Sequence, residues 1–211
     1  VRRLANEGVD FITPVYHPLG PMPEIKDDVV AAIVEQAHRE GLQAVGHVLE
    51  AEVMQRYVKM GLDGFVHPPS IHHVGSRTDA QIRQTARVLA EHGSPVTTTL
   101  SVEPLYIIDQ TFAAIIDSTS PVRVRIESQA RDIGLLAEGG VSLAVGTDWC
   151  ACVVAANAHS GIQPGAVTVT EMQMLRWGGM SRQAIIQAAT ANAARALEME
   201  EKIGTLERGK L

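Results

Sequence analysis

The stretch VSLAVGTD, residues 141–148, decides the fold that this sequence predicts. It is a short apolar run that ends in Gly-Thr-Asp, which is typical of a buried parallel strand with a carboxylate at its carboxyl end. Two earlier stretches have the same form but end in histidine: QAVGH, residues 43–47, and LDGFVH, residues 62–67. In a parallel α/β barrel the carboxyl ends of all strands share one face, where the chemistry takes place. The terminal residues of the three stretches are therefore expected to meet there: His47, His67 and Asp148.

Strand-like and helix-like patterns alternate along the rest of the chain. Apolar or β-branched runs begin near residues 9, 43, 62, 95 and 141, and segments with helical spacing of their apolar residues separate them. This alternation predicts a parallel α/β sheet. A complete (β/α)8 barrel needs about 250 residues, so five strands leave an open sheet or an incomplete barrel as alternatives. Residues 1–5 resemble the end of a helix that leads into a strand, and we therefore expect a partial TIM-type (β/α)8 barrel whose first three strands precede Val1.

Length, charge and cysteine content limit the class of protein. With 211 residues, 45% of them hydrophobic, the chain is long enough to bury a sizeable core, and we expect one domain over residues 1–211. The formal net charge of −6 argues against nucleic-acid binding, which requires a basic surface. No apolar run approaches the ~18 residues of a membrane span, and two cysteines, Cys150 and Cys152, cannot form a disulfide framework. We therefore expect a small-molecule substrate, no nucleic-acid or membrane partner, and a cytoplasmic location.

Two questions stay open at this point. The first residue is Val1 rather than Met, so a signal peptide ahead of it is an alternative to the cytoplasmic location. An incomplete barrel also leaves sheet edges with unpaired backbone groups. We therefore expect the chain alone to be poorly stable or to associate with itself, for example as a homo-oligomer.

Several motifs carry a resemblance to a known family. The stretches GH (46–47), GLDGFVH (61–67) and VGTD (145–148) resemble the later motifs of the amidohydrolase superfamily. The tail, with GMSRQAI, ATANAARAL and IGTLERGK, is similar to the branch that contains imidazolonepropionase and the Xaa-Pro/Xaa-Arg dipeptidases. Each motif alone is weak, but together they cover nearly the whole chain in the right order.

The resemblance implies a metal-dependent hydrolase. His47 and His67 would close the fifth and sixth barrel strands and Asp148 the eighth. In the family these residues bind one or two divalent metals, usually zinc, which activate a water molecule to attack an amide, ester or ring carbon. Asp148 would bind the metal and accept the proton of that water. The family's first-strand His-x-His pair and small β-sandwich domain have no counterpart in residues 1–211.

The sequence departs from the family at one position that matters. The branch usually has a carboxylated lysine on the fourth strand, where it bridges two metals, but the equivalent stretch here places Thr13 at that position. A threonine hydroxyl cannot form such a bridge. The alternatives are that the enzyme uses one metal, that His17 in the following loop substitutes for the lysine, or that this copy is inactive.

The residue types themselves support a metal site when they are taken together. Catalytic zinc takes three protein ligands and leaves a position for water, whose pKa falls towards about 7. Alone, His47 is more simply a core histidine and Asp148 a turn or helix-cap residue, but three such residues at matching strand ends favour zinc or a similar metal. Two loop histidines are candidates for contact with substrate: His159, in the loop after Asp148, and His17.

Other polar residues have simpler interpretations. His72 and His73 follow His67 closely and are expected to be loop residues. Glu171 lies three residues after Thr168, which is the spacing of a capping box at the start of a helix. Residues 181–197 are expected to form one further helix, with Ile185, Ile186, Ala189 and Ala193 facing inward.

We therefore expect a metal-dependent hydrolase that acts on a C–N bond in a cyclic amide, an amide or a dipeptide-like substrate. The alternative is a truncated or inactive amidohydrolase-like barrel that serves as a binding or structural module. A phosphate-binding barrel enzyme without metal is weaker, because no glycine-rich loop opens a helix in this sequence.

Overall fold

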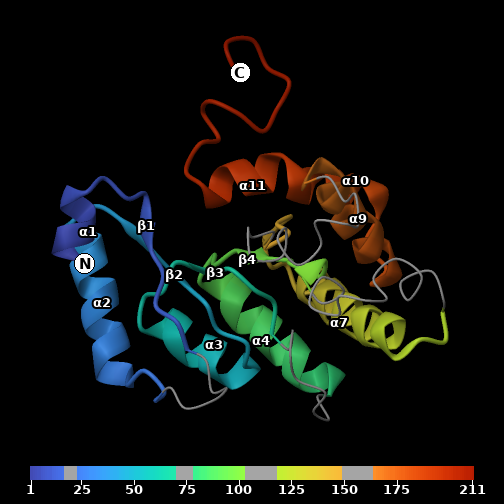
Figure 1. Ribbon diagram of the computed structural model, residues 1–211, viewed down its shortest axis with the longest axis horizontal. Coiled ribbons are helices and arrows are strands. Elements are labelled where there is room, and N and C mark those ends of the chain that lie inside the picture. The colour runs from blue at the N-terminus through green and yellow to red at the C-terminus, as the bar shows by residue number, and fades with distance from the viewer. Residues whose placement is uncertain (17–22, 70–77, 103–117, 149–163) are drawn as a thin grey trace.

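The computed structural model describes residues 1–16, 23–69, 78–102, 118–148 and 164–211. Its centre is a five-stranded sheet in the order β1-β2-β3-β4-β5, and every neighbouring pair is parallel. The strands are short: β1 (Phe11–Ile12), β2 (Gln43–Gly46), β3 (Gly64–Phe65), β4 (Val96–Thr97) and β5 (Leu143–Ala144). Because all strands run in one direction, their carboxyl ends lie at one edge of the sheet (Figure 1). The predicted parallel α/β architecture is confirmed.

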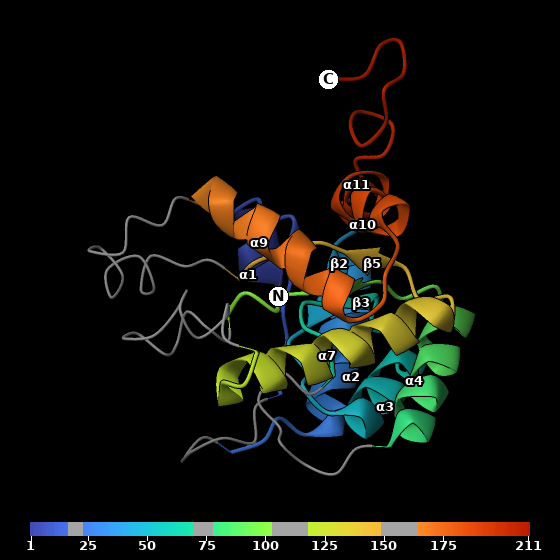
Figure 2. The ribbon, with the colours of Figure 1, turned by 90° about the vertical axis from the view of Figure 1, so that its right-hand side faces the viewer.

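Helices separate the strands along the chain and cover the sheet. The helices are α1 (Arg2–Asn6), α2 (Asp27–Arg39), α3 (Ala51–Lys59), α4 (Asp79–Glu91), α7 (Pro121–Glu138), α9 (Pro164–Trp177), α10 (Arg182–Ala189) and α11 (Ala191–Ala196). Figures 1 and 2 show α3, α4 and α7 on one side of the strands and α10 and α11 on the other. Neighbouring helices pack on each other, α3 on α4, α4 on α7 and α7 on α9.

The core forms where the apolar stripes of the helices meet the sheet. The helices α2, α3, α4, α7, α9 and α10 contribute buried side chains at helical spacing, which is the pattern of an amphipathic helix on a sheet. Members of this cluster include Val34 of α2, Met54 and Tyr57 of α3, Ile82 and Leu89 of α4, and Ile133 and Leu136 of α7. Phe65 and Val96 contribute from the strands. This packing holds the strand ends in fixed positions relative to one another.

The outer edge of β5 is covered by the last helices. The backbone N–H of Val145 donates to the carbonyl of Ala188 at 3.0 Å, and Nδ2 of Asn192 donates to the carbonyl of Leu143 at 3.1 Å. The expectation of unpaired backbone groups at the sheet edge is therefore wrong for these two groups of β5. The carbonyl of Ala188 and the side-chain amide of Asn192 thus serve as the acceptor and the donor that a neighbouring strand would otherwise supply.

The same contact explains why residues 181–197 do not form one continuous helix. The chain bends at Thr190, whose φ and ψ of −127° and −89° are not helical, and α10 and α11 are separate helices. The carbonyl of Ala188 accepts from Val145 of the sheet, so it is turned away from the next helical turn. Ile185 is buried as expected, but Ile186 is 56% exposed, so its predicted inward position is wrong.

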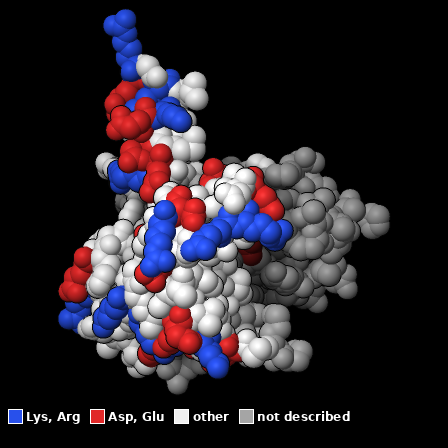
Figure 3. All heavy atoms as spheres, turned by 90° about the vertical axis from the view of Figure 1, so that its left-hand side faces the viewer, with Lys and Arg blue, Asp and Glu red and all other residues white. Residues whose placement is uncertain are grey.

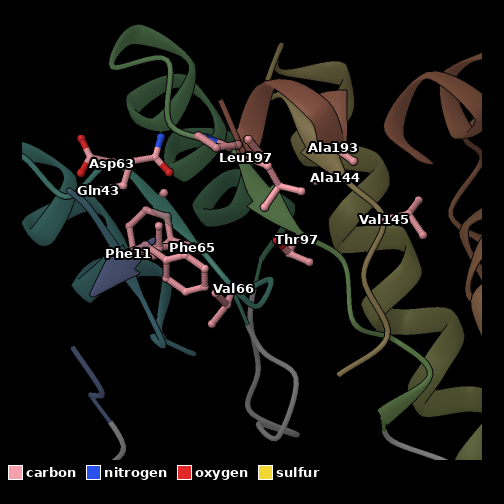
Figure 4. Close-up of a pocket in the computed structure, with 14 residues that line it drawn as sticks. Phe11, Gln43, Asp63, Phe65, Val66, Thr97, Ala144, Val145, Ala193 and Leu197 are labelled. Carbon is pink, nitrogen blue, oxygen red and sulfur yellow. The ribbon is translucent and has the colours of Figure 1, made fainter. Parts of the chain in front are cut away.

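An apolar cavity of about 220 Å³ lies between the strands and α11. Figure 4 shows the side chains of Phe11 and Phe65 close together at one end and Ala193 and Leu197 of the α11 region at the other. This cavity is mostly apolar. Its charged residue, Asp63, accepts a hydrogen bond from the N–H of Ala44 at 2.7 Å and is paired with His38 at 2.9 Å, so it serves the fold.

Among the described residues, no helix has both the length and the apolar character needed to cross a bilayer. On the face drawn in Figure 3, acidic and basic side chains are interspersed.

Candidate active site

His47 lies directly after β2, and the segment that follows β1 holds its backbone. The N–H of His47 donates to the carbonyl of Pro14 at 3.0 Å, and the carbonyl of His47 accepts from the N–H of Tyr16 at 2.9 Å. The preceding Gly46 packs closely on Leu62, because a Cβ there would lie 2.5 Å from Cδ2 of Leu62 and would force that side chain to move. These contacts fix His47 at the carboxyl end of the sheet, and its Nε2 atom is buried there.

His67 follows β3 and is only 5% exposed. The centroid of its ring is 4.4 Å from that of His47, and the two ring planes are inclined by 79°. Nδ1 of His67 forms a hydrogen bond of 2.9 Å with Oγ1 of Thr99. When that hydroxyl accepts a hydrogen bond from Nδ1–H, Nε2 of His67 carries the lone pair that a metal requires. Thr99 is thus placed to select this tautomer of His67.

Thr99 has an unusual backbone conformation for its residue type. It follows β4, and its φ of 44° lies in the left-handed region, which β-branched residues rarely adopt. Its N–H still donates to the carbonyl of Gly146 at 3.1 Å, which is the last backbone–backbone hydrogen bond between this segment and the β5 segment in the described part of the chain. Such strain persists only where the surrounding structure imposes it, and it is found most often at functional sites.

Asp148 follows β5 through Gly146 and Thr147. Its φ of 51° is also in the left-handed region, which aspartate tolerates better than most residues. Gly146 is required for close packing, because a Cβ there would overlap Cγ2 of Thr97 on β4. The carbonyl of Thr147 accepts a hydrogen bond of 3.3 Å from Oγ of Ser101. Two loops at the carboxyl end of the sheet are thereby joined next to Asp148.

These side chains surround one cavity of about 340 Å³. His47, His67, Thr99 and Asp148 line it, and Thr13 lines it from the end of β1. Residues that lie far apart in the sequence are therefore brought to one place by the parallel topology. A cavity of this volume is at the lower end of the range for small-molecule sites.

The donor chemistry around this cavity fits a divalent metal. Two neutral imidazoles and a carboxylate are ligands that zinc accepts. The two imidazoles are adjacent, and Asp148 lines the same cavity. Within the part of the chain that the structure describes, however, no three His, Cys, Asp or Glu side chains come close enough together to hold one ion. The imidazole pair is thus the part of the expected ligand set that the structure brings into contact.

The other residues expected at the site divide into two groups. Thr13 lies at the cavity, where the resemblance would have placed a bridging lysine, and its side chain carries no charge. His17 and His159, expected near the substrate, lie outside the described residues, as do His72 and His73.

Glu171 has a role other than the expected helix cap. The expected capping box with Thr168 is wrong, because α9 begins at Pro164 and Glu171 lies in its interior. The side chain is fully buried and accepts the backbone N–H groups of Leu100 at 2.9 Å and Ser101 at 2.6 Å. Burial raises the pKa of this carboxyl, while these N–H groups and the hydroxyls of Thr98 and Ser101 act in the opposite direction.

Comparison with known proteins gives one family match. The model of the amidohydrolase family matches residues 13–211. A search of curated proteins found no match. Among solved structures, a Xaa-Pro dipeptidase with bound methionine has a TM-score of 0.68 and 24% identity, over 100% of this chain and 49% of that one.

Two further structures show the same fold. A molinate hydrolase has a TM-score of 0.70 and 20% identity, over 100% of this chain and 46% of that one. An adenosine deaminase from Xanthomonas campestris with bound zinc has a TM-score of 0.58 and 18% identity, over 99% of this chain and 45% of that one. The chain thus spans about half the length of each structure, and the expected partial TIM-type barrel is confirmed.

Proposed function

The chain belongs to the amidohydrolase family, and from this membership we propose that it carries metal ligands of a hydrolase that breaks a C–N bond with an activated water molecule. The observation that carries the proposal is the perpendicular contact between the rings of His47 and His67, at 4.4 Å, at the cavity that Asp148 also lines. A structural pair of core histidines would not need a carboxylate and a strained threonine at the same cavity.

Each residue has a distinct part in the proposed reaction. His47, His67 and Asp148 would hold a divalent metal, for which two imidazoles and a carboxylate suit zinc. When bound, the metal supplies a water molecule acidic enough to ionise near neutral pH. Asp148 would also accept a proton from the attacking water as general base and pass it to the leaving nitrogen. Thr99 keeps the His67 ring in one tautomer and orientation through the 2.9 Å hydrogen bond.

Thr13 favours the use of one metal ion rather than two. The carboxylated lysine that bridges two metals in the family is anionic and has two oxygen donors, whereas the Thr13 hydroxyl at this cavity is neutral and has one oxygen. The substrate class proposed is an amide, cyclic amide or dipeptide-like molecule. The likeness in fold to a Xaa-Pro dipeptidase and to molinate hydrolase supports this class without selecting among its members.

The test measures metal content and hydrolysis in the full natural chain. Purified wild type, His47→Asn and Asp148→Asn are loaded with Zn²⁺, dialysed and analysed for metal, then assayed with a panel of dipeptides and cyclic amides. We expect about one zinc per wild-type chain, loss of zinc in His47→Asn, and at least a ~100-fold loss of hydrolysis in Asp148→Asn.

A matched control is His92→Asn. His92 ends α4, and its Nδ1 bonds to the carbonyl of Val88 at 2.8 Å, away from the cavity. This variant should keep both zinc and activity. Equal zinc content and equal hydrolysis in wild type, His47→Asn and Asp148→Asn would overturn the proposed function.

A further inference from the structure

A buried carboxylate outside the cavity holds the segment on which the candidate site depends. Glu171 lies inside α9 and is not among the residues that line the cavity. Its Oε1 accepts from the N–H of Leu100 and its Oε2 from the N–H of Ser101, so both oxygens act on consecutive peptide groups. Two charge-assisted hydrogen bonds to neighbouring backbone donors fix a loop more firmly than a single neutral bond does.

The chain at residues 98–101 needs such an anchor. Strand pairing with the β5 segment ends at Thr99, whose N–H donates to the carbonyl of Gly146. At the same residue the backbone turns into the left-handed region, with φ of 44°. The next two N–H groups, of Leu100 and Ser101, are buried and leave the sheet, so they need other acceptors. Glu171 provides both.

The anchored segment touches the candidate site in two places. On one side, Oγ1 of Thr99 is 2.9 Å from Nδ1 of His67. On the other, Oγ of Ser101 donates to the carbonyl of Thr147, the residue before Asp148, at 3.3 Å. A shift of the segment would therefore alter the orientation of an expected ligand and the position of the expected base at the same time.

We propose that Glu171 is a positioning residue, which clamps the Leu100 and Ser101 peptides and through them aligns His67 and Asp148. The catalytic part of this inference rests on the proposed function, whereas the alignment of His67 does not. A purely structural glutamate would stabilise the fold when present but would leave the His67 ring and the metal affinity unaffected by its removal.

The test compares Glu171→Gln with Met174→Ala in the full natural chain. Glutamine keeps the shape of the glutamate side chain, but its NH₂ group is a donor and would face one of the two backbone N–H donors, of Leu100 or Ser101. Met174, one turn further along α9, is fully buried in the core, so its truncation destabilises the protein without touching the clamp. Stability is measured by urea unfolding, the His67 ring by ¹⁵N–¹H imidazole NMR assigned with His67→Asn, and Zn²⁺ affinity by titration with zinc alone.

We expect both variants to lose stability, but only Glu171→Gln to move or broaden the His67 imidazole signals and to weaken zinc binding by about 10-fold or more. In the same variant kcat should fall with KM nearly unchanged, because Glu171 does not line the cavity. His67 signals and zinc affinity that match those of Met174→Ala would overturn the proposal. The NMR comparison needs no turnover, so failure of the hydrolase proposal and failure of the clamp are distinguishable.

A second variant covers the case in which Glu171→Gln does not fold. Ser101→Ala keeps both backbone N–H groups that Glu171 accepts, but it removes the hydroxyl that donates to the Thr147 carbonyl and also acts on the Glu171 carboxyl. It should weaken Zn²⁺ binding by several-fold while the His67 signals stay near those of wild type. Unchanged zinc affinity in a folded Ser101→Ala protein would overturn the link from the clamped segment to Asp148.

Discussion

Oγ1 of Thr99 lies 2.9 Å from Nδ1 of His67, although the two residues follow different strands. The backbone of Thr99 adopts the strained left-handed conformation at this position. Because a ligating imidazole is oriented by the partner of its other nitrogen, we expect Thr99→Val to weaken Zn²⁺ binding by about 10-fold or more. Valine preserves the volume and the branched Cβ but removes the hydroxyl. Thr99→Ser, which keeps the hydroxyl, is the control and should bind zinc nearly as wild type does. Titration with zinc measures the three affinities. Equal affinities in wild type, Thr99→Val and Thr99→Ser would contradict the role of the Thr99 hydroxyl in orienting His67.

The glycine before Thr147 and Asp148 is needed for space. A Cβ on Gly146 would overlap Cγ2 of Thr97, so we expect Gly146→Ala to lower the free energy of unfolding by about 1–3 kcal/mol. Combining it with Thr97→Ser, which lacks that methyl group, should restore part of the loss. Urea unfolding measures both.

Gly165 in α9 provides the matched control for this substitution. A Cβ there meets nothing within 4 Å, so Gly165→Ala should stabilise the helix by up to about 1 kcal/mol. Equal effects of the two alanine substitutions would show that space at Gly146 is not limiting.

Local sequence was sufficient for the order and type of the main elements. The strands β1 to β5 fall within the apolar runs that suggested them, because a strand buried on both faces needs consecutive apolar residues and the flanking glycines end the helices before them. The break at Thr190 was not visible in this way. It depends on the hydrogen bond between Ala188 and Val145, a contact between distant segments that no helical periodicity contains.

The candidate site was predictable only in part. The rule that parallel strands end at one face is sufficient to bring His47, His67 and Asp148 to one cavity. Thr99 lay inside a stretch that looked like an ordinary strand, and its importance comes from a distance and a backbone angle. The roles of His47, His67 and Asp148 as metal ligands, and of Asp148 as base, stay predictions.

For Glu171 a sequence signal did exist. Val167, Glu171 and Met174 have the i, i+4, i+7 spacing of one helical face, and both Val167 and Met174 are buried. A glutamate on an apolar stripe indicates a buried carboxylate that has a specific partner. The capping-box spacing from Thr168 hid this signal, because it assumed that the helix began later than it does.

Asn192 covers the edge of β5 and should contribute measurably to stability. Its Nδ2 donates to the carbonyl of Leu143 at 3.1 Å, and its Oδ1 accepts from Arg195 at 3.0 Å. We expect Asn192→Ala to lower the free energy of unfolding by about 1–2 kcal/mol, because the carbonyl loses its partner. Sedimentation should also show more self-association, since an edge with an unpaired carbonyl can pair with another chain.

The control is Arg195→Ala, which removes the exposed partner of Asn192 and leaves the bond to β5 in place. Its effect on the free energy of unfolding should stay within about 0.5 kcal/mol. If Arg195→Ala and Asn192→Ala are equally destabilising, the bond to Leu143 is not what holds this edge.

Tyr16 gives the fold a dependence on alkaline pH. It packs edge-to-face on Tyr57 beside the His47 segment, and burial, with the nearby carboxylates of Glu50 and Glu24, raises its pKa to about 12. A tyrosine in the unfolded chain ionises near pH 10. Above that pH the unfolded state loses the proton first, so stability is fully present below about pH 10 and declines as the pH rises through about 12.

Tyr16→Phe removes this ionisation, and the comparison isolates it from other alkaline effects. We expect the free energy of unfolding of wild type to fall more steeply than that of Tyr16→Phe between about pH 10 and 12, by on the order of 1–2 kcal/mol. Below about pH 9 the two curves should run parallel, because Tyr16 is neutral in both states there. Urea unfolding at closely spaced pH values measures the difference. Curves that stay parallel through the whole alkaline range would mean that the Tyr16 phenol ionises as readily in the folded protein as in the unfolded chain.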